Sequence, residues 1–135
     1  MRIHISTKGS VPIYQQIVTQ VKHMVASGRL RPGEEVLPIR TLAEQLLINP
    51  NTVARAYREL EAAGILNSRR GSGTRVSDKG SPLGYTERLR VLTDLVRGLL
   101  VEADQLDFTI EDIAEIIKEQ NRLLVSPERR NDKDE

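Results

Sequence analysis

The chain of 135 residues contains no cysteine and no tryptophan, and only one phenylalanine and three tyrosines. Without cysteine it has no disulfide, no thiolate for a metal and no cysteine nucleophile, which fits a reducing cytoplasm. No apolar run approaches the roughly 18 residues of a membrane span, and residues 1–10 lack the apolar core of a signal peptide. We expect a cytoplasmic protein without membrane association, whose core is built from Leu, Ile, Val and Ala on packed helices.

Charge is distributed unevenly, although the formal net charge is only +1. Residues 1–82 hold 12 Lys and Arg against 6 Asp and Glu, whereas residues 83–135 hold 8 against 13. A basic half suits a polyanionic partner, and an acidic half suits a different one. Chance variation along the chain produces such a difference too, so charge alone decides nothing.

The first half of the chain has helical periodicity. Apolar residues in 12–27 recur at three- and four-residue steps, with Pro12 in the first turn and Gly28 as the C-terminal cap. A short second helix opens at Pro38. We expect its inward residues to be Leu42, Ala43, Leu46 and Leu47.

Asn49 and Pro50 predict the start of a third helix, because Asn caps an orphan N–H and proline has none to leave unpaired. Val53, Ala56, Tyr57 and Leu60 give this helix an apolar stripe, and Gly64 ends it. Two helices so closely spaced are typical of a helix-turn-helix. Residues 65–76 then predict a short hairpin, the wing, with a basic tip that contains glycine.

Residues 77–84 (SDKGSPLG) have the composition of a linker. Beyond them, apolar residues at alternating three- and four-residue steps form a coiled-coil-like seam that one helix cannot bury: Leu89, Leu92, Val96, Leu99, Ala103 and Leu106. Thr109 and Asp112 resemble a capping box for a second amphipathic helix, which carries Ile113 and Ile117. We expect these eight apolar residues to hold a homodimer together.

These patterns predict a mainly α protein with a small β-wing. The expected parts are a winged helix-turn-helix DNA-binding domain (1–77), a linker (78–84), a two-helix dimerisation region (85–125) and a disordered tail (126–135).

Double-stranded DNA is the partner that the candidate site residues favour. A helix presented to the major groove needs small hydrogen-bonding side chains at its start, and Asn49, Asn51 and Thr52 are of this kind. Arg55 and Arg58 follow where the flanking backbone would lie, and Arg40 can reach a phosphate or a guanine. The wing offers Arg69, Arg70, Gly71 and Gly73 to a minor groove. Solvated charge at a hairpin tip and an ordinary helix cap are the plainer interpretations.

The order and spacing of five blocks resemble the winged helix-turn-helix of the GntR family: PIYQQI (12–17), SGRLRPGEE (27–35), IRTLAEQL (39–46), NPNTVARAYRELEAAGIL (49–66) and RRGSGTRV (69–76). The resemblance implies DNA contact by Arg40, Asn51, Thr52 and the Arg70-Gly71 tip. Two departures stand out. Asn49-Pro50 replaces a frequent Ser-Arg pair, and the proline before Arg40 is displaced by one position.

Asn-Pro-Asn-Thr-Val-Ala-Arg-Ala-Tyr with a short C-terminal region is similar to the YtrA-type subgroup. That resemblance implies a helix pair used for dimerisation, and a role as repressor of an operon encoding an ABC-type transporter.

Other classes of function fit the sequence less well. His4 and His23 are far apart and no nucleophile accompanies them, so we expect neither an enzyme nor a cofactor. Asp104, Asp107, Glu111 and Asp112 fit capping and solvation better than a metal site, and we expect no metal. A helical adaptor whose winged domain binds protein remains the alternative function. A small-molecule effector is left open, but the region after the linker is too short to enclose a metabolite within one chain.

Overall fold

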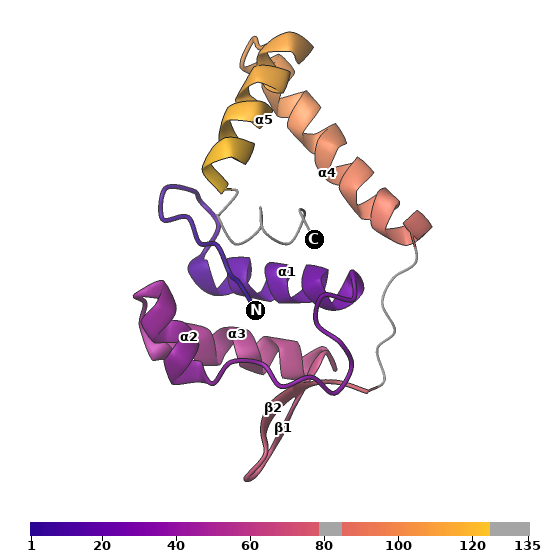
Figure 1. Ribbon diagram of the computed structural model, residues 1–135. Helices are drawn as coiled ribbons and strands as arrows, with labels where there is room; N and C mark the ends of the chain where they lie inside the picture. Colours follow the sequence, from indigo (N-terminus) through magenta and orange to yellow (C-terminus); the bar gives the residue numbers. More distant parts are fainter. Residues whose placement is uncertain (79–84, 125–135) are drawn as a thin grey trace. The chain divides into compact units, whose positions relative to one another are not determined.

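The computed structural model describes residues 1–78 and 85–124, and the chain separates into two compact units, Met1–Arg88 and Leu89–Glu135 (Figure 1). The described residues form five α-helices and one two-stranded antiparallel sheet, which confirms the predicted mainly α fold with a small β-wing. The predicted linker, except Asp78, and the predicted tail lie outside these residues. The described part has no helix long and apolar enough to cross a membrane.

The first unit is built around α3 (Pro50–Ala62), which packs against α1 (Ile13–Ala26) and α2 (Ile39–Leu46) (Figure 1). The predicted apolar stripe of α3 is buried, which places one face of this helix in the core. The core side chains of the three helices are Ile17, Val18 and Val21 of α1, Leu42 and Ala43 of α2, and Val53, Ala56, Tyr57 and Leu60 of α3.

The predicted start of α3 and the predicted glycine ends of α1 and α3 are confirmed by hydrogen bonds and backbone angles. The Asn49 Oδ1 accepts a hydrogen bond from the Asn51 N–H at 2.8 Å, and Pro50 is the first residue of α3. Gly28 and Gly64 follow α1 and α3 with φ of 81° and 76°, the left-handed conformation that glycine adopts at least cost. Pro12 lies one residue before α1 rather than within its first turn.

Leu47 departs from the prediction. Its side chain is 91% exposed, not inward, and its φ of 56° is left-handed. The helical period continues through Leu47 in the sequence, but α2 ends at Leu46 and the Ile48 N–H donates to the Ala43 carbonyl at 3.0 Å. This bond closes the helix end, so the residue inside the turn points outward.

The wing consists of β1 (Leu66–Arg69) and β2 (Gly73–Val76), paired from Leu66 with Val76 to Arg69 with Gly73. The segment 33–36 runs along the other edge of β2, since Gly33 N–H donates to the Val76 carbonyl and Val76 N–H to the Glu34 carbonyl, both at 2.8 Å. The wing is therefore attached to the segment that leads into α2 as well as to α3.

Two glutamines on α1 hold the N-terminal segment in place. Gln20 exchanges two hydrogen bonds with the backbone of His4, and Gln16 exchanges two with the backbone of Ser6. Ile3, just before these points, is buried in the core, and Ile5, between them, packs against it. Residues 3–6 are thus fixed by side chains one helical turn apart.

The second unit contains most of α4 (Tyr85–Gln105) and all of α5 (Ile110–Leu124), which diverge from a shared turn (Figure 1). The predicted capping box is confirmed: Thr109 N–H donates to the Asp112 carboxylate at 2.9 Å, and Asp112 N–H to the Thr109 hydroxyl at 3.2 Å. Hydrogen bonding of the Asp112 carboxylate by Thr109, most strongly by its backbone N–H, lowers the pKa of Asp112.

The apolar residues of the second unit are mostly exposed. Ala103 is buried and Ile113 is half-buried. The other residues of the predicted dimerisation set are accessible to solvent in the single chain: Leu89, Leu92, Val96, Leu99, Leu106 and Ile117.

Leu47→Gly is expected to raise the free energy of unfolding by about 1 kcal/mol, because glycine removes the left-handed strain of a residue that buries nothing. Urea denaturation at matched protein concentration measures it. The control is Leu47→Ala, which keeps the Cβ and should give no gain. Equal stabilisation by both variants would show that the gain in stability does not come from relief of left-handed strain.

Candidate nucleic-acid interface

The exposed side of α3 begins with polar residues. Asn51 is exposed and Thr52 is half-buried, while the Asn49 side chain is engaged as the cap of the helix. Arg55 lies four residues after Asn51, and Arg58 three residues after Arg55, so these residues follow one another along neighbouring turns. The start of α3 therefore presents two hydrogen-bonding side chains and then two guanidinium groups.

Five of the predicted arginines have no acidic partner. Arg40, Arg55, Arg58, Arg69 and Arg70 are all exposed, and none forms an ion pair within residues 1–78 and 85–124. Arg40 comes from the start of α2, Arg55 and Arg58 from α3, and Arg69 and Arg70 from the wing. The first unit thus carries five cationic groups that a phosphate backbone could neutralise.

Arg75 is paired, in contrast to those five. Its Nη2 lies 3.7 Å from Glu35 Oε2, and its Nη1 donates to the Gly33 carbonyl at 3.2 Å. Both side chains are about half exposed, so the ion pair adds little stability. Its effect is to cancel one positive charge at the base of the wing.

The two wing glycines differ in their surroundings. Gly71 has φ of 86° at the tip, with open space where a Cβ would lie. Gly73 has φ of 76°, and a Cβ there would lie 2.8 Å from Glu35 Oε1. Gly73 therefore makes room for a carboxylate of the same chain, whereas the sequence had suggested room for a groove.

Two hydrogen bonds connect α3 to its neighbours. The buried Tyr57 donates its hydroxyl proton to the Leu37 carbonyl at 2.6 Å, and burial raises the pKa of this tyrosine. Ser68 of β1 donates to the Glu61 carboxylate of α3 and lies 3.0 Å from the Thr74 hydroxyl of β2. These contacts fix the segment before Arg40 and the wing relative to α3.

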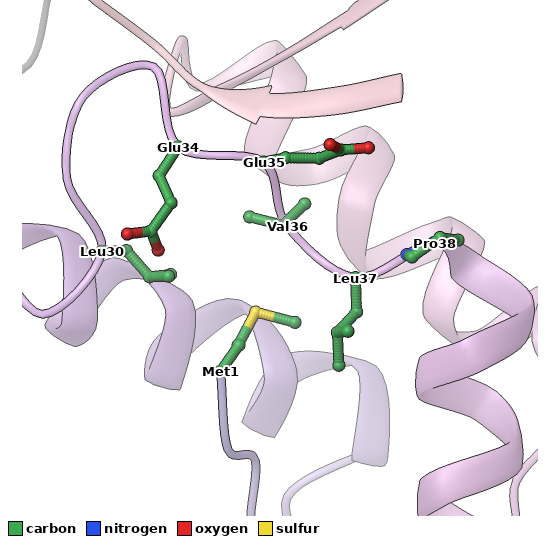
Figure 2. A pocket seen from close by; sticks show the side chains of 7 residues that line it. All are labelled: Met1, Leu30, Glu34, Glu35, Val36, Leu37 and Pro38. Carbon is green, nitrogen blue, oxygen red and sulfur yellow. The ribbon is translucent and has the colours of Figure 1, made fainter. Parts of the chain in front are cut away.

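A small pocket lies beside the segment that leads into α2 (Figure 2). Its volume is about 230 Å³, below the several hundred cubic ångströms typical of metabolite sites. Figure 2 shows the Glu35 carboxylate pointing away from Met1. The lining residues are Met1, Leu30, Glu34, Glu35, Val36, Leu37 and Pro38.

A larger hollow of about 450 Å³ lies at the turn between α4 and α5. It is lined by Leu100, Asp104, Asp107, Phe108, Thr109, Ile110 and Ile113. The hollow continues the exposed apolar surface of the second unit. Across the described ranges, no three His, Cys, Asp or Glu side chains are grouped so that they could hold a metal ion.

Four contributors to the site were not predicted from the sequence. Tyr14 of α1 lies under the Arg55 guanidinium, with Cζ 3.7 Å from the ring centroid. Glu35 and Arg75 form the pair beside the wing, and Glu61 links α3 to β1. Two of these contacts join residues some forty positions apart and the third joins the consecutive elements α3 and β1, and helical periodicity contains no signal for any of them. The PIYQQI block was the one indication that singled out Tyr14.

Known proteins match this fold along most of the chain. The model of the family described as "Bacterial regulatory proteins, gntR family" matches residues 13–76. The HTH-type transcriptional repressor YtrA of Bacillus subtilis (strain 168) is 34% identical over 87% of this chain and 90% of its own.

Two solved structures agree with this match. A transcriptional antiterminator from Listeria monocytogenes EGD-e is 32% identical, with a TM-score of 0.57 over 90% of both chains. The GntR-family transcription factor YtrA from Sulfolobus acidocaldarius is 27% identical, with a TM-score of 0.52 over 92% of this chain and 100% of its own.

The chain therefore belongs to the GntR family of bacterial regulatory proteins, whose winged helix-turn-helix is its first unit. Within the family it is similar to the YtrA-type members, which it matches through the C-terminal helices as well. The sequence-based expectations of family, subgroup and fold are confirmed. The individual DNA contacts stay predictions.

Arg70→Ala and Arg75→Ala are expected to differ in their effect on duplex binding. Removing Arg70 should reduce the magnitude of the slope of log affinity against log salt by about 0.9, because this arginine would no longer neutralise a phosphate. Removing the already paired Arg75 should leave the slope unchanged. Fluorescence anisotropy across a salt series measures both variants. Equal slopes for the two would remove the wing tip from the interface.

Proposed function

We propose that this protein is a sequence-specific transcription repressor that acts as a homodimer on an inverted-repeat operator. The observation that carries the proposal is a set of five exposed arginines on α2, α3 and the wing that form no ion pair within residues 1–78 and 85–124. Membership of a family of DNA-binding regulators supports it. Repression is proposed because a relative that this chain matches over 90% of the relative's length is a transcriptional repressor.

The start of α3 would read bases in the major groove. Asn51 can form two hydrogen bonds with an adenine edge, and Thr52 can contact a base or a phosphate. Asn49 caps the helix through its Oδ1, which accepts from the Asn51 N–H, and the N–H groups of its side-chain amide would be left to contact DNA. Arg40, Arg55 and Arg58 would bind the flanking phosphates, and Arg69 and Arg70 would enter or straddle the minor groove with Gly71 at the tip.

Residues 85–125 would form the dimerisation region, joined to the winged domain (1–77) by the linker. Leu92 is 58% exposed and Leu106 is 70% exposed, and an apolar surface of this extent marks an interface. A second copy presents the same seam and can cover it about a two-fold axis. The acidic charge of this half keeps it off DNA.

Two-fold symmetry determines the form of the operator. Two recognition helices related by such an axis read half-sites of opposite orientation, about one helical turn (roughly 34 Å) apart. The resemblance to YtrA-type regulators implies an operon encoding an ABC-type transporter as the target, and that part of the proposal rests on the resemblance alone.

The proposal is tested by anisotropy with duplex from upstream of the protein's own operon, against a scrambled duplex, across a salt series. We expect at least a hundredfold tighter binding to the native duplex. Asn51→Ala should cost about 1 to 3 kcal/mol on the native duplex and much less on the scrambled one. Weak and equal binding of the wild type to both would contradict the proposal and favour the adaptor.

Leu99→Asp is expected to convert the dimer to monomers, because it places a charge within the apolar seam. Sedimentation velocity at micromolar concentration measures the state of assembly. The control is Glu102→Asp, a charged position of the same helix, which should remain dimeric. An intact Leu99→Asp dimer would refute this interface.

A further inference from the structure

The contact between Tyr14 and Arg55 connects α1 to the DNA-facing side of α3. The Arg55 Cζ lies 3.7 Å from the centroid of the Tyr14 ring, which is stacking distance and well within the range of a cation–π contact. Tyr14 is half-buried and Arg55 is exposed. The ring therefore supports one face of a guanidinium whose other face is open to solvent.

This stacking leaves the hydrogen-bonding capacity of Arg55 unused. The N–H groups of a guanidinium lie in its plane, at the rim, so a ring that covers one face does not occupy them. No carboxylate of the described residues pairs with Arg55 either. The guanidinium is thus held by the ring while its N–H groups remain accessible, which leaves them available to a ligand.

The location of Arg55 indicates the kind of ligand. It lies one helical turn beyond Asn51 on α3, next to the residues proposed to read bases. Phosphate is the anion that duplex DNA presents beside its base edges, and a planar guanidinium can donate two N–H groups to one phosphate.

We propose that Tyr14 is a positioning residue for DNA binding, which holds the Arg55 guanidinium ready to bind a backbone phosphate. This inference rests on the proposed function and adds to it a residue from outside the helix-turn-helix. A free arginine side chain loses about 2 kcal/mol of rotamer entropy when a ligand fixes it, and stacking on Tyr14 removes part of that loss beforehand.

Arg58 is the matched control within the same helix. It is exposed, lies three residues after Arg55, and makes no ring contact or ion pair in residues 1–78 and 85–124. Loss of the Tyr14 ring should therefore act through Arg55 and leave any contribution of Arg58 intact.

The experiment is a double-mutant cycle on the affinity for duplex DNA, with Tyr14→Leu, Tyr14→Phe, Arg55→Ala and Arg58→Ala. We expect Tyr14→Leu to weaken binding roughly fivefold and Tyr14→Phe, which keeps the ring face, to bind like the wild type. In the Arg55→Ala background, Tyr14→Leu should have less than a twofold effect, whereas in the Arg58→Ala background it should keep its full effect.

The salt dependence separates positioning from charge. Arg55→Ala should reduce the salt slope by about 0.9, because the positive charge is removed. Tyr14→Leu should change the slope by much less, because Arg55 retains its charge. All affinities are measured well below the melting temperature of the least stable variant.

The results separate failure of the Tyr14 positioning role from failure of the proposed repressor function. A fivefold loss with Tyr14→Phe as well, or an equal loss with and without Arg55, would overturn the positioning role while the repressor proposal stands. Wild-type binding that neither prefers the native duplex nor weakens steeply with salt would refute the repressor and this inference together.

Discussion

Burial of one face of α3 against α1 and α2 is the constraint on which the surface proposed to bind DNA depends. Val53, Ala56, Tyr57 and Leu60 enter the core at helical spacing, so the residues between them can only lie on the opposite side. Asn51, Arg55 and Arg58 are oriented in this way by apolar packing and need no polar contact of their own to face outward. Stability and the proposed DNA recognition therefore involve different residues of the same helix.

The same helix, α3, also makes the contacts that fix the neighbouring elements relative to one another. Tyr57 ties it to the segment before α2, Glu61 ties it to the wing through Ser68, and Tyr14 of α1 supports Arg55. These are contacts between elements rather than within them, and they restrict how far Arg40, Arg55 and the wing can move independently. A surface fixed in this way loses less conformational entropy when it binds a regular ligand such as duplex DNA.

Sequence patterns predicted the helices, their caps and the hairpin because those features depend on neighbours a few residues away. Asn49, Gly64 and the Thr109–Asp112 box are local in this sense. Leu47 was predicted wrongly because periodicity indicates which face a residue shares but not where the helix ends. The Arg75–Glu35 pair and the Tyr14–Arg55 stack join residues some forty positions apart, which only the packing of α1, α3 and the 33–36 segment brings together. The unpaired arginines of the predicted site could be listed from the sequence, but which arginine is neutralised could not.

The absence of a side chain at Gly73 affects the charge that the wing presents, because it determines whether Glu35 can pair with Arg75. The Glu35 carboxylate occupies the space where a side chain at position 73 would lie, and from there it pairs with Arg75. A larger residue at 73 would be strained by the left-handed φ and would push that carboxylate aside, which would weaken its pairing with Arg75. Affinity for all duplexes would then rise relative to affinity for one operator. In the regulator proposed here, an uncharged position of the hairpin would thus influence the balance between binding to the genome at large and binding to a particular promoter, and substitution at that position would alter selectivity.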